Sequence, residues 1–152
     1  MIGHGIPEDA VDLAVRHPLV AIASDGGAFI TGGEHPRGAG TFARVLGHYV
    51  REMSLLTLMD ALRKMTLMPA QRLESFAPQM QLKGRIREGA DADITIFDPK
   101  LISDHATFED PHRFATGVQH VLVNGIPVVS DGRHTGKLPG RAVRGPGWTQ
   151  AQ

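Results

Sequence analysis

Residues 20–27 read Val-Ala-Ile-Ala-Ser-Asp-Gly-Gly, a short apolar run that stops at a carboxylate and two glycines. Together with Leu19, this run predicts a fully buried strand over 19–23, because Pro18 bounds it on one side and a glycine turn on the other. In parallel α/β proteins, the carboxyl ends of buried strands display the catalytic side chains. Asp25 is therefore the first candidate for a functional residue.

Helical patterns lie on both sides of the predicted strand. Residues 7–16 predict a short helix, since a proline and two acids occupy its first turn. Thr41 is expected to cap a longer amphipathic helix. Thr57 and Asp60 resemble a capping box at the start of a second helix of this region, and Pro69 is expected to start a third, short one.

From Gly84 onward the sequence predicts strands instead of helices. Residues 92–97 alternate in polarity and end at a turn signal. Asn124-Gly125 separates two apolar runs and predicts a type I′ hairpin over 121–129, because both turn residues tolerate a positive φ. Asp131-Gly132 marks another turn. The chain thus divides into a βα-type segment and a small β-rich module.

Composition narrows the possible function classes. The 152 residues are 41% apolar, which suits one domain or one domain plus part of another. Sixteen basic residues balance sixteen acidic ones, so we expect neither nucleic acid nor a membrane as a partner. The absence of cysteine excludes disulfides, thiolate nucleophiles and thiolate metal sites. The apolar runs are too short to span a bilayer and no signal peptide is recognised, so a cytoplasmic location is expected.

Several short motifs carry a resemblance to a known family. They are Ser24-Asp25-Gly26-Gly27, His35-Pro36-Arg37, Gly-Thr-Phe-Ala-Arg-Val-Leu-Gly at 40–47, Tyr-Val-Arg-Glu at 49–52, Arg-Lys-Met-Thr at 63–66, Pro-Ala-Gln-Arg-Leu at 69–73, Ala92-Asp93-Ile94 and Val123-Asn124-Gly125. Over residues 18–144 the chain resembles the C-terminal portion of the N-acyl-D-amino-acid deacylases (D-aminoacylases) of the amidohydrolase superfamily. The block 24–46 is specific to the deacylases, whereas the last two motifs are shared across amidohydrolases.

The resemblance implies an α/β fold, the C-terminal fragment of a metal-dependent (β/α)8 barrel followed by a small β-sandwich module. Residues 1–80 would form the last barrel strand and its helices, with the eighth strand at 19–23. Residues 81–145 would form the β-rich module, and residues 146–152 a tail.

The resemblance also implies chemistry for the loop after the strand. Asp25 would stand beside the zinc, where a carboxylate can take a proton from the activated water and pass it to the departing amide nitrogen. Arg37 matches the arginine that holds the substrate carboxylate, a task that suits a planar, always charged group. His35, Gly26 and Gly27 share this loop and are assigned to substrate binding by proximity. The implied substrate is a small N-acyl amino acid.

The chain departs from the family in its metal ligands. The family uses a His-x-His pair and further His, Cys or Lys ligands, whereas this sequence has no His-x-His pair and no cysteine. A catalytic zinc needs three protein ligands, so Asp25 contributes at most one. We therefore expect zinc in the complete enzyme but none held stoichiometrically by this chain. We also expect the chain to be inactive without the missing barrel strands.

Other interpretations of the same residues stay open. Asp25 is also compatible with an ordinary turn aspartate, and Arg37 with a surface ion pair. The main alternative function is a non-catalytic relic of the same fold that forms homo-oligomers through unpaired strand edges. A β-rich carbohydrate or peptide binder is disfavoured because only 5% of the residues are aromatic.

Overall fold

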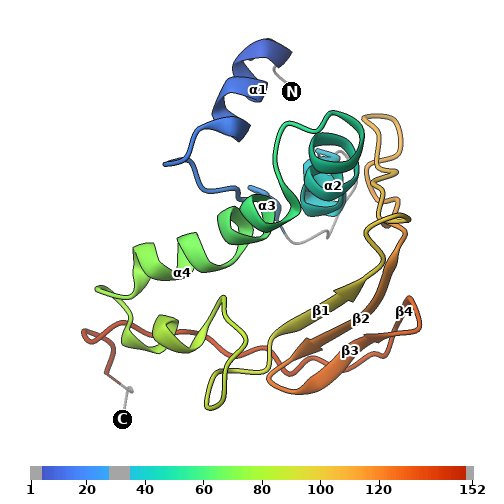
Figure 1. Ribbon diagram of the computed structural model, residues 1–152. Coiled ribbons are helices and arrows are strands. Elements are labelled where there is room, and N and C mark those ends of the chain that lie inside the picture. Colours follow the sequence, from blue (N-terminus) through green and yellow to red (C-terminus); the bar gives the residue numbers. More distant parts are fainter. Residues whose placement is uncertain (1–4, 28–34, 150–152) are drawn as a thin grey trace.

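The structure of the protein is a computed structural model that describes residues 5–27 and 35–149. Its helices form one layer and an antiparallel sheet forms the other (Figure 1). The elements in chain order are α1 (Glu8–Arg16), α2 (Arg37–Arg44), the π-helical η1 (Val45–Glu52), α3 (Leu58–Met65), α4 (Leu67–Leu73), the 3₁₀ helix η2 (Pro78–Leu82), β1 (Ile94–Phe97), β2 (Val118–Val123), β3 (Ile126–Ser130) and β4 (Arg133–His134). No helix within the described ranges is long and apolar enough to cross a membrane.

The strand expected over 19–23 is not formed. Residues 17–27, which we call the extended segment, have no strand partners among the described residues. The segment contains a turn at Pro18 and Leu19 and a positive φ of 48° at Asp25, and the Leu19 side chain is exposed. The prediction of a buried strand is therefore wrong for this structure. A buried parallel strand needs a neighbour on each edge, and the strands that the structure describes all belong to an antiparallel sheet elsewhere in the fold.

The helix α1 confirms the expectation for its segment. Two acids, Glu8 and Asp9, occupy its first turn, where their negative charges interact favourably with the positive end of the helix dipole. The helix ends at Arg16 because His17 precedes Pro18 and the residue before a proline avoids the helical conformation.

The next helix begins earlier than the sequence suggests. Thr41 does not cap it, because α2 starts at Arg37 and the Thr41 hydroxyl donates a hydrogen bond to the Arg37 carbonyl at 2.8 Å. Pro36 precedes the first turn with helical dihedral angles, and the His35 Nδ1 atom accepts the Arg37 N–H at 3.1 Å. A proline that needs no N–H partner and an imidazole acceptor thus open the helix in place of a threonine hydroxyl.

The threonine cap expected at the start of α3 is confirmed. The Thr57 hydroxyl accepts the Asp60 N–H at 3.1 Å and donates to the Asp60 carboxylate at 2.7 Å. The following helix α4 starts at Leu67 instead of Pro69. Pro69 lies in its first turn, where a missing N–H removes no intrahelical hydrogen bond.

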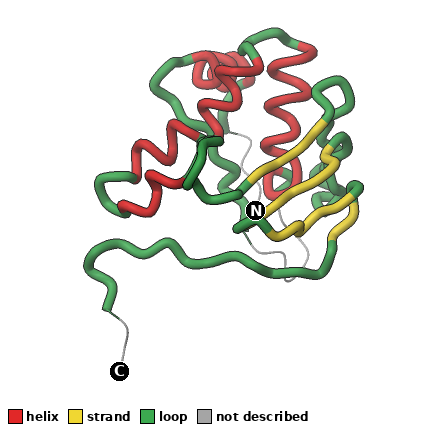
Figure 2. The backbone as a smooth tube through the Cα atoms, turned by 60° about the horizontal axis from the view of Figure 1, so that its bottom comes forward, coloured by secondary structure: helices red, strands yellow, loops and turns green. Residues whose placement is uncertain are grey.

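The sheet has the strand order β1-β2-β3-β4, and every neighbouring pair is antiparallel. Asn124 and Gly125 have φ values of 50° and 76°, which confirms the type I′ turn between β2 and β3. Asp131 and Gly132 turn the chain in the same way between β3 and β4. Within the described ranges this is a single sheet, so the sandwich that the resemblance implies is not formed by these residues. Residues 135–149, which follow β4, run as a loop (Figure 2).

Ile102 joins the helical layer to the loop that leads from the sheet. Its side chain is fully buried and belongs to the same apolar core as Val45, Leu46 and Ala61. Gly117 makes this possible, because it has a φ of 83° and a Cβ there would lie 2.4 Å from the Ile102 nitrogen. The core thus forms between helices and a loop rather than on the face of a barrel sheet.

Candidate functional site

Asp25 and Arg37 form a paired site at the end of the extended segment. The Arg37 Nη2 atom lies 2.6 Å from the Asp25 Oδ2 atom, and the Arg37 Nε–H donates to the Asp25 carbonyl oxygen at 3.2 Å. Two sides of one guanidinium group therefore bind one residue, which is the planar two-point geometry that arginine provides. The Asp25 and Arg37 side chains are 82% and 46% exposed, respectively, so water screens the pair.

The two predicted glycines differ in their surroundings. A Cβ at Gly26 would lie 2.9 Å from the Gly38 Cα atom, so the first turn of α2 can approach Asp25 only if residue 26 is a glycine. The Gly26 N–H also donates to the Ser24 hydroxyl at 3.2 Å. Gly27 has no described atom within 4 Å of such a Cβ. Gly26 is thus a packing residue of the site, and Gly27 is adjacent in sequence alone.

His35 contacts the site through the start of α2. Its Nδ1 atom accepts the Arg37 N–H, and its ring packs edge-on against Phe108 with 5.1 Å between the ring centroids. The structure therefore brings Asp25, Gly26, His35 and Arg37 together. Residues 28–34, which complete the glycine loop in the sequence, lie outside the described residues.

The described residues do not by themselves fit a zinc ion. Over 5–27 and 35–149 there is no group of three or more His, Cys, Asp or Glu side chains arranged to hold a metal. Asp25 is a single donor whose carboxylate is bound to Arg37. A zinc site needs three protein ligands, and among the described residues the Asp25 site offers one.

Lys64 is a buried residue that the sequence analysis missed. Its side chain is 3% exposed, and its Nζ atom donates hydrogen bonds to the carbonyl oxygens of His17 and Val20. Burial lowers the pKa of Lys64, the neighbouring Arg63 lowers it further, and Asp60 partly opposes both. Helical spacing would have revealed it, because Lys64 lies three residues after the buried Ala61 and hence on the same face.

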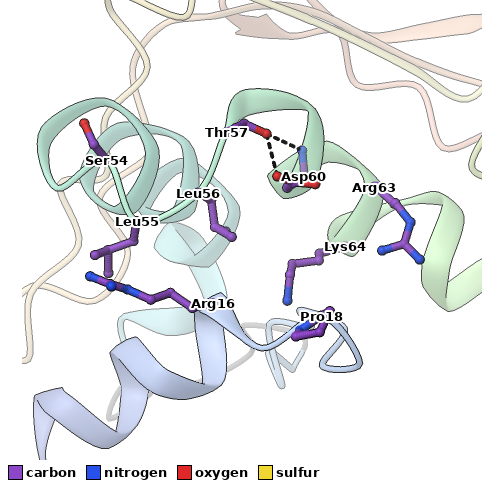
Figure 3. A pocket seen from close by; sticks show the side chains of 9 residues that line it. All are labelled: Arg16, Pro18, Ser54, Leu55, Leu56, Thr57, Asp60, Arg63 and Lys64. Carbon is purple, nitrogen blue, oxygen red and sulfur yellow. Dashed lines mark hydrogen bonds between the residues drawn. The ribbon is translucent and has the colours of Figure 1, made fainter.

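A cavity of about 490 Å³ lies beside Lys64 and not at Asp25 (Figure 3). Its lining combines three basic groups, one acid and several loop residues: Arg16, Pro18, Ser54, Leu55, Leu56, Thr57, Asp60, Arg63 and Lys64. None of the predicted site residues lines it. The cavity borders the start of the segment that leads to the paired site.

Comparison with known proteins places the chain in a family. The family model for the amidohydrolase family matches residues 2–129. The chain belongs to the amidohydrolase family. This confirms the resemblance stated from the motifs around Asp25 and Arg37.

Similar members of the family are deacylases. This amidohydrolase is 42% identical to a D-aminoacylase of Alcaligenes xylosoxydans xylosoxydans over 109 residues, which cover 72% of this chain and 22% of that protein. A D-aminoacylase structure with a binuclear metal centre aligns at a TM-score of 0.79 with 37% identity, covering 87% of this chain and 27% of that one. An N-acyl-D-glutamate deacylase of Bordetella bronchiseptica, complexed with zinc and a phosphonate mimic of the tetrahedral intermediate, aligns at 0.71 with 40% identity. The alignment with this deacylase covers 85% of this chain and 27% of the deacylase chain. The chain thus spans about a quarter of the length of these relatives.

Proposed function

We propose that this amidohydrolase chain takes part in hydrolysing the amide bond of N-acyl-D-amino acids, as the C-terminal part of a larger catalytic unit. The observation that carries the proposal is the contact between the Asp25 carboxylate and the Arg37 guanidinium at 2.6 Å. The pair puts a proton-transfer group and a carboxylate-binding group side by side. The deacylase names of the similar proteins support the same reaction class.

In this proposal Asp25 is the acid/base residue. Its carboxylate would accept a proton from the attacking water and deliver it to the leaving amide nitrogen. Arg37 would bind the substrate carboxylate with the two-point geometry that it now uses on Asp25. His35 and Gly26 would keep Arg37 and Asp25 in register, the first through the start of α2 and the second by allowing the close approach.

The rest of the catalytic unit would come from outside the described residues. We assign zinc to the complete enzyme, on ligands that this part of the chain does not supply. The missing barrel half, or a second copy of the chain, would be the partner. In this assignment residues 1–80 belong to the barrel, 81–145 to the β-rich module and 146–152 to a tail. The cytoplasmic location stays a prediction.

The test is the substitution Asp25→Asn in the complete enzyme. We expect turnover of N-acyl-D-amino acids to be lost while the circular dichroism spectrum is unchanged, because asparagine keeps the shape but cannot accept the proton. Asp131→Asn is the matched control, since Asp131 is also an exposed turn aspartate, with a φ of 51° against 48° for Asp25. Retained turnover in Asp25→Asn, or equal loss in both variants, would contradict the assignment.

One observation favours the alternative of a non-catalytic oligomerising module. β1 is at the edge of the sheet, with β2 as its one partner among the described strands. An unpaired edge can pair with a second chain. Light scattering combined with elemental analysis separates the two proposals. A metal-free homo-oligomer that stays inactive when the missing barrel half is supplied would favour the module.

A further inference from the structure

Lys64 is the one buried charged side chain among the described residues. It lies in the last turn of α3, where its side chain points toward Pro18 and the start of the extended segment (Figure 3). A buried ammonium group is unfavourable unless its donors are hydrogen-bonded. Here the Nζ atom donates to two carbonyl oxygens, those of His17 and Val20, the second at 2.9 Å.

The backbone of Lys64 binds the same segment. The Ile22 N–H donates to the Lys64 carbonyl oxygen at 3.1 Å. Side chain and backbone together thus make three hydrogen bonds to the part of the chain between His17 and Ile22. Within the described ranges no strand pairs with this part of the chain.

We propose that Lys64 is a positioning residue for Asp25, because its ammonium and carbonyl groups fix residues 17–22 through these three hydrogen bonds. Asp25 follows Ile22 by three residues, so the two Cα atoms are at most about 10 Å apart. A displacement of Ile22 is therefore transmitted to the carboxylate over a short piece of chain. The part of the proposal that concerns catalysis rests on the proposed function, whereas the fixing of the segment does not.

The charge, and not the bulk of the side chain, carries this role. Lys64→Met keeps an unbranched side chain of similar length but removes all three ammonium donors. If Lys64 served only to fill space, methionine would be an equal or better occupant of a 3% exposed position. If Lys64 holds the two carbonyls, methionine removes this donor from the Val20 carbonyl and leaves the His17 carbonyl with the Val20 N–H alone.

The first experiment is amide hydrogen exchange on the full 152-residue chain. In Lys64→Met we expect the Ile22 amide to exchange about 10- to 100-fold faster than in the unsubstituted chain, the range for losing charge-assisted hydrogen bonds. Arg63→Met is the control, because Arg63 is the exposed neighbour that lines the same cavity. Unchanged exchange at Ile22 in Lys64→Met, or equal acceleration in both variants, would overturn the proposal.

A chemical rescue separates charge from packing. The chain has no cysteine, so Lys64→Cys introduces a single thiol that can be alkylated in denaturant before refolding. Alkylation with 2-bromoethylamine restores an amine at nearly the position of Nζ, whereas 1-bromopropane gives an apolar side chain of the same length. We expect slow exchange of the Ile22 amide to return in the aminoethyl form and not in the propyl form. If Lys64→Met does not fold, we expect the aminoethyl form to refold and the propyl form not to. Equal behaviour of the two alkylated forms would overturn the proposal.

A kinetic measurement addresses the catalytic part. In the complete enzyme, Lys64→Met is expected to lower kcat about 10- to 100-fold while the KM for an N-acyl-D-amino acid changes little, since Arg37 is part of α2 and not of the displaced segment. An unchanged kcat would overturn the positioning role. The failure of the proposed function has a different signature, because it appears as retained turnover in Asp25→Asn and leaves the exchange of Ile22 unaffected.

Discussion

The substitution Gly26→Ala tests how closely the site depends on one backbone contact. A Cβ at position 26 would lie 2.9 Å from the Gly38 Cα atom and 3.3 Å from the Ser24 hydroxyl. Carbon atoms in favourable contact are about 3.5 to 4.0 Å apart, so the segment and the first turn of α2 must separate by about 0.6 to 1 Å. The obstructing atom belongs to the backbone, and no side-chain rotation relieves the overlap.

The size of the effect follows from comparison with Gly27→Ala. Overpacking costs about 1 to 3 kcal/mol, and the lower end applies at this exposed position. A Cβ at Gly27 would have no described atom within 4 Å, and the φ of Gly27 is not positive. Alanine at position 27 is expected to raise the free energy of unfolding by about 0.4 to 1 kcal/mol, because it reduces the conformational entropy of the unfolded chain. We therefore expect the free energies of unfolding of the two variants to differ by about 1 to 2 kcal/mol, with Gly26→Ala the less stable.

Urea unfolding followed by circular dichroism measures this difference. The ¹⁵N signal of the Arg37 Nε–H group reports the contact to Asp25 directly and should shift in Gly26→Ala alone. In the complete enzyme the same separation is expected to lower turnover about 100-fold, the effect of a displacement near 1 Å. Equal unfolding free energies and an unshifted Arg37 signal would refute the reasoning.

Two further predictions concern the core and the sheet. Gly117→Ala is expected to lower the free energy of unfolding, measured with urea, by about 3 kcal/mol or more, because strain at a positive φ adds to overlap with backbone atoms. Gly89→Ala is expected to lower it by only about 1 to 2 kcal/mol, because it carries the strain without the overlap. Burial alone would raise the pKa of Asp93, but hydrogen bonds from the Asn124 N–H and the Lys83 ammonium outweigh it and hold the pKa below that of an ordinary aspartate. The free energy of unfolding should therefore fall as the pH drops below about 4, and this fall should be smaller in Asp93→Asn.

The sequence predicted best those features that depend on a few adjacent residues. Asn124-Gly125 forms its turn because two neighbouring residues accept positive φ values. Thr57 and Asp60 form their cap because they are three residues apart on one helix. The short motifs around Asp25 are likewise sufficient to identify the amidohydrolase family, because each is a run of adjacent residues.

The errors arose where a distant part of the chain decides the outcome. The apolar composition of 19–23 predicts a buried strand, but burial requires neighbouring strands that the described residues do not supply. Thr41 resembles a helix cap, yet Pro36 and His35 open the helix one turn earlier.

The sequence by itself determined the family, the turns, the helix cap at Thr57 and the residue types of the candidate site, because each is encoded in local order and spacing. Only the tertiary structure decided that Asp25 contacts Arg37 at 2.6 Å, that Gly26 differs from Gly27, and that Lys64 is buried. Those contacts join residues 12 to 47 positions apart. Their partners are selected by the packing of α2 and α3 against the extended segment, which no local pattern specifies.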